Sequence, residues 1–445
     1  MSTVARQQAP APPHRNVDGR NRGIDGRNGG IDGRDRGIDG RDRGIDGLRT
    51  YAIGGVVLGH WLVTALVLAP GGALRAASPL ITMPELVPAT WLFQTLGLFF
   101  FVSGYGSARS LQSANSRGLG STEWLRRRLG RLVRPVLLLL GGWTVALAVA
   151  AMLGTPAATL RTAATLVVSP LWFLLPLVVL IALTGPLSRA LRRYGPLRLS
   201  IAAVTLVALG DLAGRNLSDI RNWPVPLPGD GSWRVPVAVL AAWLVPYLLG
   251  MALAGGRLGD RRTGWWLLLG GAAGMTGLVL YGGYPASAVG VPGDGMSNLD
   301  PPSLFAVSLA LAQIGAAVLI RPAVAGWLAR PRRWRPVHRL NTAAMGVYLW
   351  HQTILLGVTA LAALVARLAG WGAVPGLHSV PDGPGWVLAR LAWLPLLGLA
   401  LAVLVGRPGR SERPGRSERP GPGSSPPTVG NPSTGFAPTR GAGVR

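Results

Sequence analysis

Ten long apolar runs follow one another between residues 50 and 406 of this 445-residue chain. They restrict its possible folds more than any other feature. About 20 apolar residues in helical conformation are enough to cross a bilayer. The runs cover residues 50–69, 91–108, 133–153, 163–184, 198–214, 235–255, 264–281, 303–320, 341–366 and 386–406. We therefore predict an all-α integral membrane protein, a bundle of about ten transmembrane helices.

The composition agrees with a polytopic membrane protein. Charged residues make up 14% of the chain, against roughly 25% in soluble proteins, and 49% of the residues are hydrophobic. The net charge of +26 could indicate a nucleic-acid partner, but most of the basic residues, all arginine, lie in the two ends of the chain and in alternate connections between runs. The sequence has no single basic face with interleaved aromatic residues, which argues against nucleic-acid binding. Because the chain has no cysteine, disulfides and thiol nucleophiles are excluded.

The arginines between the runs indicate how the helices are oriented. Arginine-rich connections follow every second run, and the intervening ones hold few arginines or balance them with acidic residues. The positive-inside rule then places both termini in the cytoplasm. The abundance of Arg, Gly, Ala and Pro is typical of a GC-rich bacterial genome, so we expect a multi-pass protein of the bacterial plasma membrane. The connecting arginines are Arg126, Arg127, Arg128, Arg131 and Arg134 after the second run, Arg189, Arg192 and Arg193 after the fourth, Arg257, Arg261 and Arg262 after the sixth, and Arg330, Arg332, Arg333, Arg335 and Arg339 after the eighth.

Both ends of the chain differ from its middle. Residues 1–47 are rich in Arg, Gly and Asp and contain a seven-residue repeat whose last copy is GRDRGID. Such a segment cannot bury enough apolar surface to offset the entropy of ordering it. We therefore predict a disordered tail over 1–47, a membrane domain over 48–406, and a second disordered, cytoplasmic tail over 407–445.

One ionisable residue, His60, interrupts the first run near its middle, and Arg49 lies directly before the run. Eleven residues separate them, so at about 100° per residue they share one helix face, roughly 16 Å apart along the axis. A titratable side chain near the middle of a membrane is costly and marks a candidate functional site. The alternative is a structural histidine that is hydrogen-bonded inside a helix bundle.

The second and third runs carry two further candidate elements. The second run contains Phe99–Tyr105, in which small residues permit close helix packing and Ser103 can bond across a helix interface. The stretch Arg126–Arg134 then enters the third run. Its guanidinium groups can clamp phosphate oxygens. The alternatives are plain packing for Phe99–Tyr105, and a topology signal with anionic-lipid contact for the arginines.

The fourth and ninth runs contain the remaining candidate functional residues. We expect Leu171–Leu174 at the outer end of its helix, where an aromatic anchor at the membrane interface is the simplest explanation. Tyr348 and His351 lie in the ninth run, and His351 is about as deep in its run as His60 is in the first. Two histidines at matched depth favour a shared polar cavity, although His351 is also compatible with simple packing. The runs offer essentially no carboxylates at that depth, so we expect no metal site.

Together these residues resemble the acyltransferase 3 family of integral membrane acyltransferases, from about Asp42 to Gly406. The family's first motif, an arginine followed after ten residues by a histidine, is matched by Arg49 and His60, with Asp46 before it. The chain departs from many members at Leu175–Leu177, where they have a glutamate-rich sequence, which indicates a divergent branch. The other matching elements are Phe99–Tyr105, Arg128, Arg131 and Pro135, Leu171–Leu174, and Tyr348 to His351.

The resemblance implies transfer of an acyl group, most often acetyl, from acyl-coenzyme A to a hydroxyl of a carbohydrate, a cell-envelope glycan or lipid, or a small metabolite. It implies no permanently bound cofactor. Imidazole, with a pKa near 6.5, suits the removal of a hydroxyl proton at neutral pH, so His60 is the expected base or acyl relay. Arg49 together with Arg128, Arg131 and Arg134 would hold the coenzyme A phosphates or stabilise the developing oxyanion.

Ser103, Tyr348 and His351 are expected to contact the acceptor or to orient His60. A polytopic transporter or flippase also fits ten hydrophobic helices with intramembrane histidines. Transporters usually contain related halves with broken helices, and no similarity between the two halves of the chain is visible. A non-catalytic membrane scaffold is a third alternative.

Overall fold

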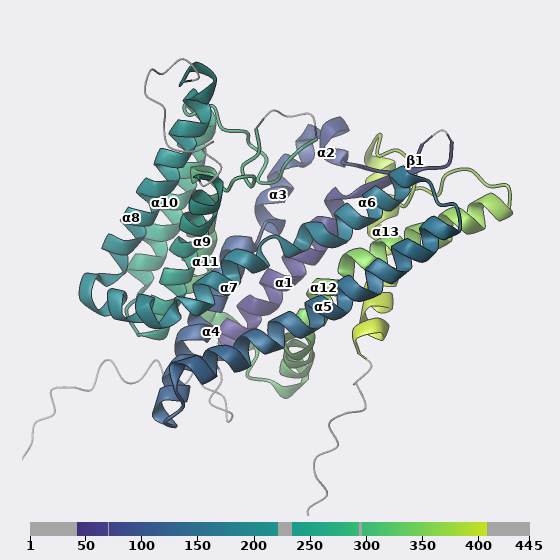
Figure 1. Cartoon of the computed structure of the whole chain (residues 1–445). Helices are drawn as coiled ribbons and strands as arrows, with labels where there is room; N and C mark the ends of the chain where they lie inside the picture. The colour runs from purple at the N-terminus through teal and green to yellow at the C-terminus, as the bar shows by residue number, and fades with distance from the viewer. Residues whose placement is uncertain (1–41, 70, 221–233, 293–295, 407–445) are drawn as a thin grey trace, which may run out of the picture. The chain divides into compact units, whose positions relative to one another are not determined.

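The computed structural model describes residues 42–69, 71–220, 234–292 and 296–406 (Figure 1). Within these ranges the chain is almost entirely helical, as the apolar runs predict. Residues 1–41 of the tail predicted over 1–47, and the whole tail predicted over 407–445, lie outside the described residues. The helices are α1 (Arg43–Val63), α2 (Pro79–Thr82), α3 (Val87–Phe93), α4 (Leu96–Ser116), α5 (Ser121–Met152), α6 (Ala157–Val168), α7 (Leu174–Ala182), α8 (Thr184–Ile220), α9 (Arg234–Ala254), α10 (Arg261–Leu280), α11 (Leu304–Trp327), α12 (Pro331–Leu368) and α13 (Pro384–Val405).

Nine helical spans in the described ranges are long and apolar enough to cross a membrane, and they correspond to nine of the ten predicted runs. The first run forms α1, which has 21 residues but is not among these nine. Asp46, Arg49 and His60 lower its mean hydropathy. α1 packs against α4, α11 and α12, and Figure 1 shows it in the middle of the helices. Because neighbouring helices surround it, α1 does not need the apolar exterior of a lipid-facing helix.

Helix α1 begins earlier than the predicted boundary between residues 47 and 48. Asp42 caps it by accepting a hydrogen bond from the backbone N–H of Ile45 at 3.0 Å. The same carboxylate forms a 2.9 Å ion pair with Arg321 of α11 and accepts a 3.1 Å hydrogen bond from the Tyr105 hydroxyl of α4. Within the last copy of the seven-residue repeat, Asp42 therefore joins the start of α1 to α4 and α11.

The end of the first run differs from the prediction. The run was expected to be helical to residue 69, but α1 ends at Val63 and Thr64 is its C-cap. Residues 65–68 form strand β1 (Ala65–Leu68), which pairs antiparallel with β2 (Leu74–Ala77). β-branched Thr64 and Val67 favour extended backbone, and the apolar character of the run does not distinguish a helix from a short strand.

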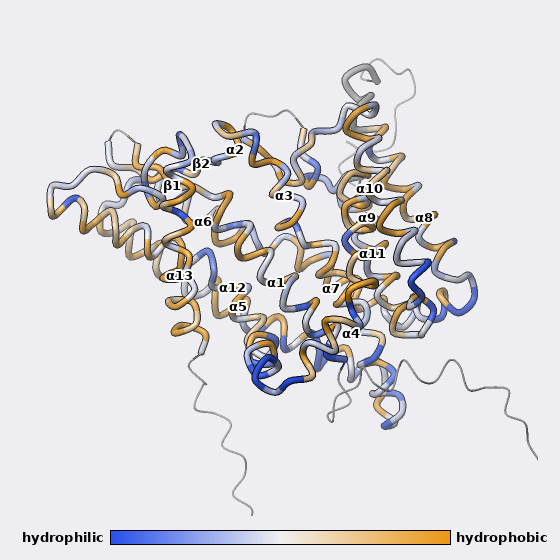
Figure 2. The backbone as a smooth tube through the Cα atoms, turned by 180° about the vertical axis from the view of Figure 1, so that it is seen from behind, coloured by the Kyte–Doolittle hydropathy of each residue, from blue (hydrophilic) through white to orange (hydrophobic). Residues whose placement is uncertain are grey.

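The arginines gather at one end of the helices. We call this the arginine-rich end, and define it as the end at which α5 and α12 begin, near Arg126 and Arg333. Figure 2 shows the most hydrophilic stretches of backbone concentrated there, below long hydrophobic segments. Arg43, at the start of α1, lies at the same end, because its guanidinium donates to the carbonyl of Ala329 between α11 and α12 at 3.0 Å.

Two glycines allow α4 and α9 to pack with their backbones in contact. A Cβ atom added to Gly104 would overlap the carbonyl of Tyr247, and one added to Gly250 would overlap the carbonyl of Phe101. Close approach through small residues is the usual way in which helices associate tightly in membranes. Within Phe99–Tyr105, the candidate element of the second run, Gly104 therefore has a packing role.

The fourth predicted run is not one continuous helix. Its span, Ala157–Ala182, is interrupted after α6 by a 3-10 turn at Ser169–Leu171, and α7 resumes at Leu174. The expectation that Leu171–Leu174 lies at the outer end of a helix is therefore corrected: these residues lie at a break in the middle of the span. Proline at position 170 lacks an N–H group, which explains the interruption. The Pro170 carbonyl accepts a hydrogen bond from the Tyr348 hydroxyl.

Candidate functional site

Two cavities lie one above the other along the same helices. The larger, which we call the histidine cavity, has a volume of about 460 Å³ and is lined by residues that include His60, Gln94, Phe173 and Arg390. The smaller, the arginine cavity, has a volume of about 270 Å³. In α1, α4 and α7 the residues that line the arginine cavity lie closer to the arginine-rich end than the segments that line the histidine cavity. The predicted residues that line the arginine cavity are Arg49, Ser103, Arg128, Arg131 and Tyr348.

Tyr348 lines both cavities and marks where they meet. Its ring packs edge-on against Phe173, with ring centroids 4.8 Å apart, and Phe173 packs edge-on against Phe99 at 5.3 Å. Phe99 lines the arginine cavity and Phe173 the histidine cavity. Three aromatic rings therefore lie between a compartment rich in guanidinium groups and one that contains an imidazole.

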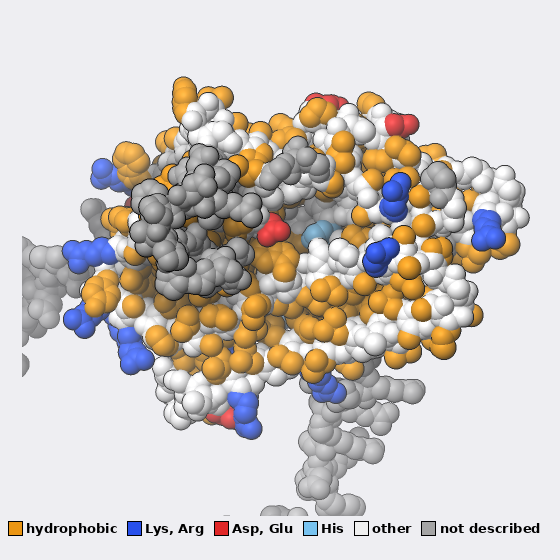
Figure 3. All heavy atoms as spheres, turned by 45° about the horizontal axis from the view of Figure 1, so that its top comes forward, with side chains coloured by type: hydrophobic (Ala, Val, Ile, Leu, Met, Phe, Trp, Pro, Cys, Tyr) orange, Lys and Arg blue, Asp and Glu red, His pale blue; other side chains and the backbone are white. Residues whose placement is uncertain are grey.

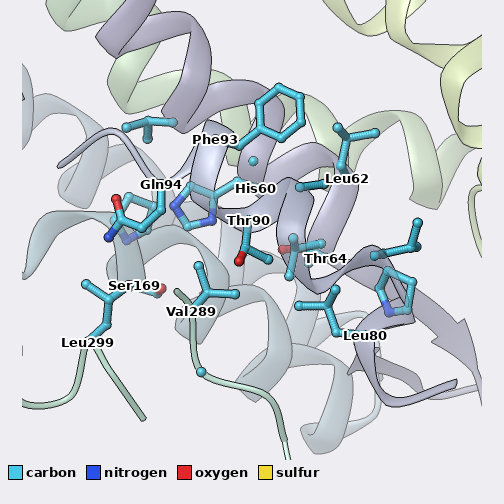
Figure 4. Close-up of a pocket in the computed structure, with 18 of the residues that line it drawn as sticks. His60, Leu62, Thr64, Leu80, Thr90, Phe93, Gln94, Ser169, Val289 and Leu299 are labelled. Carbon is cyan, nitrogen blue, oxygen red and sulfur yellow. The ribbon is translucent and has the colours of Figure 1, made fainter. Parts of the chain in front are cut away.

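His60 projects into the histidine cavity from α1. Figure 4 shows its ring facing the same space as the Thr90 hydroxyl and the Gln94 amide. Ser169, at the break between α6 and α7, also lines this space. Figure 3 looks onto the end of the helices opposite the arginine-rich end, where the surface is hollowed and a histidine side chain is visible inside. None of the described residues that line the cavity is Asp or Glu.

His351 lies directly behind His60. The two ring centroids are 5.2 Å apart, and the His351 side chain is fully buried. Its Nδ1 lies 2.6 Å from the backbone carbonyl of Tyr348, which can only accept a hydrogen bond. Nδ1 therefore carries the proton, and Nε2 is left as an acceptor without a hydrogen-bond partner among the described residues. The structure thus brings together the two histidines that the sequence placed at matched depth.

The backbone around this pair is also fixed. The indole N–H of Trp61, the residue after His60, donates to the carbonyl of His351 at 3.0 Å. Asn341, ten residues before His351 and nearer the start of α12, donates to the carbonyl of Asp46 at 2.8 Å. Both bonds join α1 to α12, so the relative register of the two histidine-bearing helices is set at two depths.

In the arginine cavity, Arg49 and Arg128 are half-buried and Arg131 is exposed; the contacts of Arg128 are the better defined. The Nη2 of Arg128 donates to the Ser107 hydroxyl at 3.0 Å, and its Nε is buried without a partner among the described residues. Arg49 approaches from α1, where Gly106 makes room for it: a Cβ atom at that glycine would lie 3.1 Å from Arg49 Nη2. Ser103 and two half-buried arginines thus line one small volume.

The structure differs from two predictions about which arginines line which part of the site. Arg134 is exposed and is not among the residues that line either cavity, because six residues along a helix place it about 120° away from Arg128. Arg49 and His60 share one helix, as predicted, but line different cavities. Arg49 is therefore grouped with Arg128 rather than with the imidazoles.

Sequence reasoning missed Arg390. Its side chain, from α13, is fully buried and lines the histidine cavity. Nη2 donates to the carbonyl of Thr64 at 2.8 Å, and the guanidinium carbon lies 4.8 Å from the centroid of Trp386. The signal was available, because a lone arginine inside the apolar run 386–406 is a candidate site by the same argument that selected His60.

The arrangement has the components of a group transfer between two compartments: cations suited to a phosphorylated carrier on one side, a neutral base on the other, and a narrow junction between them. The comparisons with curated proteins and with solved structures gave no match. The model of an acyltransferase domain, that of the acyltransferase 3 family, matches residues 42–406, which includes every described helix. This chain therefore belongs to the acyltransferase 3 family, and it is a membrane acyltransferase, an enzyme that transfers acyl groups other than aminoacyl groups.

Proposed function

We propose that this acyltransferase moves an acetyl group from acetyl-coenzyme A to a hydroxyl of a carbohydrate, cell-envelope or small-molecule acceptor. The observation that carries the proposal is the pair of cavities that meet at Tyr348, one lined by Arg49, Arg128 and Arg131 and the other by His60. A phosphorylated donor and a hydroxyl acceptor can then approach one reaction centre from opposite directions.

The donor side fits coenzyme A by its charge. Coenzyme A carries phosphate groups at the end remote from its thioester, and guanidinium groups bind phosphate oxygens with paired hydrogen bonds. The buried Nε of Arg128, which lacks a partner among the described residues, is a donor that a phosphate oxygen would satisfy. Arg49 lies roughly 16 Å along α1 from His60, too far to reach an oxyanion at the imidazole, so we assign it to the phosphates.

The chemistry is assigned to His60. Its imidazole takes the proton of the acceptor hydroxyl while the hydroxyl oxygen attacks the thioester carbonyl. The new C–O bond forms, the C–S bond breaks, and the departing coenzyme A thiolate receives the proton from the imidazolium. The products are the acyl ester and free coenzyme A, and His60 returns to its neutral form.

His351 is proposed as a positioning residue. Because its Nδ1–H is committed to the Tyr348 carbonyl, its Nε2 lone pair is available to an N–H of the neighbouring ring. A bond of this kind would fix which nitrogen of His60 faces the cavity. Ser103 and Tyr348 are proposed to contact the donor on its path between the two cavities.

The orientation follows from charge. Arginine-rich connections remain on the cytoplasmic side of bacterial membranes, so we propose that the arginine-rich end and both termini are cytoplasmic. The donor cavity then faces the compartment that contains acetyl-coenzyme A, and the hollowed face in Figure 3 is turned to the outside. Family membership assigns acyl transfer to the chain, so the proposal differs from a transporter or flippase that moves its cargo unchanged.

The test is transfer by the purified, full-length protein in lipid nanodiscs. The protein is supplied with acetyl-coenzyme A labelled with ¹³C in the acetyl group and with an extract of the cells in which it is native. Mass spectrometry should find a labelled ester and an equivalent amount of free coenzyme A. A protein that releases no coenzyme A and labels no product under these conditions would contradict the proposal.

A further inference from the structure

The histidine cavity contains a buried positive charge without a compensating carboxylate. Arg390 is fully buried and remains charged at any physiological pH, because the guanidinium group does not deprotonate in proteins. None of the described residues that line the cavity is acidic, and no ion pair of Arg390 occurs among the described residues. A buried charge is costly unless it is paired.

The contacts that Arg390 does make satisfy only part of its guanidinium. One N–H of Nη2 caps the C-terminal end of α1 through the Thr64 carbonyl, and the Trp386 ring covers one face. Nε and Nη1 are buried and have no hydrogen-bond partner among the described residues. Three of the five N–H donors of this guanidinium therefore have no partner among the described residues.

Arg390, on α13, contacts the C-terminal end of α1, the helix that carries the proposed base His60. The N–H of Thr64 donates to the carbonyl of His60 at 2.9 Å, and the carbonyl of Thr64 accepts from Arg390 at 2.8 Å. Thr64 follows His60 by one helical turn, a rise of roughly 6 Å. A molecule whose hydroxyl contacts His60 would therefore reach the guanidinium with a group located about one helical turn further out.

From this geometry we infer that the acceptor carries a negatively charged group, a carboxylate or a phosphate, which pairs with Arg390 while its hydroxyl faces His60. The inference rests on the proposed function and adds the chemical class of the acceptor. Binding of the anion supplies the missing countercharge and uses the unpartnered Nε and Nη1 donors. Neutral acceptors of the same size would leave the charge uncompensated.

The test measures the charge of the product and the role of the guanidinium. Full-length protein in nanodiscs receives [¹⁴C]acetyl-coenzyme A and a total metabolite and lipid extract of the cells in which it is native, and the labelled product is applied to an anion exchanger at neutral pH. Retention of the product supports the inference, and a neutral, unretained product overturns it. If no labelled product forms, the proposed function itself has failed, and the inference with it.

Two chemical treatments distinguish the sources of the charge. Alkaline phosphatase removes the retention of a product that bears a phosphate monoester, whereas amidation with a carbodiimide removes that of a carboxylate. Arg390→Gln should lower the rate of transfer about 10- to 100-fold, the effect of losing a hydrogen bond to a charged group. Arg367→Gln, an exposed arginine in the last turn of α12, is the matched control and should retain the wild-type rate.

The variants are compared only as folded protein, judged by size-exclusion chromatography in detergent. Arg390→Lys keeps the charge but not the fork of donors, and it should restore part of the activity lost in Arg390→Gln. A folded Arg390→Gln enzyme with wild-type transfer overturns the inference. If Arg390→Gln does not fold, the charge of the wild-type product decides the question alone.

Discussion

His351 shows how much a single hydrogen bond can determine. The Tyr348 carbonyl, 2.6 Å from Nδ1, fixes the tautomer, and burial keeps Nε2 away from water. In the proposed mechanism this residue orients His60 and does not exchange protons with the substrate. Its loss should therefore change the rate less than the loss of His60 would.

We predict that His351→Ala lowers kcat about fivefold, since one net hydrogen bond is worth about 1 kcal/mol, with little change in KM for acetyl-coenzyme A. The pH dependence of kcat should also shift, because the orientation and surroundings of His60 change. Steady-state release of coenzyme A over a range of pH checks both effects. A change in KM alone would assign His351 to substrate binding instead.

Comparing variants of Arg128 and Arg134 distinguishes a specific phosphate-binding site from a general effect of positive charge. Arg128 lines the arginine cavity and Arg134, on the same helix, does not. Arg128→Gln should raise KM for acetyl-coenzyme A roughly 10- to 100-fold with kcat nearly unchanged, the effect of removing a charged hydrogen bond. Arg134→Gln is the control and should behave as wild type. Equal effects of the two variants would contradict a specific phosphate site.

For single residues, the sequence indicates which side chains are candidates for the site but not which of them are in contact. Arg49 and His60 are visible because ionisable residues are rare in apolar runs, and their separation follows from helical geometry. The 5.2 Å contact between His60 and His351 joins residues nearly 300 positions apart, which no local pattern specifies. Arg390 carried the same signal as His60, but a single charge in a long apolar run resembles an ordinary interfacial arginine.

Among the elements, α1 and the broken span of α6 and α7 build the site. The apolar runs predict the helices well, because length and hydropathy are local properties. They do not predict the break at Ser169–Leu171, since the run is continuously apolar on both sides. The break places Ser169 and Phe173 on the histidine cavity and frees the Pro170 carbonyl for Tyr348.

The contact between α4 and α9 provides a prediction about stability. Gly250→Val should destabilise the protein by roughly 1–3 kcal/mol or more, because a side chain would overlap the Phe101 carbonyl and separate the two helices. Gly141 of α5 has open space around its Cβ position, so Gly141→Val is the control for the loss of a glycine. Thermal unfolding in detergent measures both. Equal melting temperatures for the two variants would contradict the close packing.

For the whole molecule, the orientation in the membrane connects the cavities to their substrates. The alternation of arginines indicates an orientation from the sequence alone, because each connection contributes independently. The packing order of the helices, such as α10 against α11 and α1 against α12, depends on contacts between distant segments. The sequence therefore predicts the number and direction of the spans better than their arrangement around α1.

The absence of cysteine makes the orientation directly testable. A single cysteine at Ala373, in the connection between α12 and α13, should react with a membrane-impermeant maleimide in intact cells. A single cysteine at Ser116, at the end of α4, should react only after the membrane is permeabilised. Both positions are exposed. The opposite labelling pattern would place the arginine cavity on the outside, away from coenzyme A.

The central claim is that His60 carries out acyl transfer, and the rate of His60→Ala tests it most directly. The variant is compared in nanodiscs with wild type and with His338→Ala, which removes an exposed histidine of α12. Coenzyme A release from ¹³C-labelled acetyl-coenzyme A is followed with a thiol reagent, to which a cysteine-free chain gives no background. The account predicts that His60→Ala loses at least about 10²-fold in rate while its membrane insertion and melting temperature stay unchanged, and that His338→Ala keeps the wild-type rate. Wild-type transfer by a folded His60→Ala enzyme would contradict it.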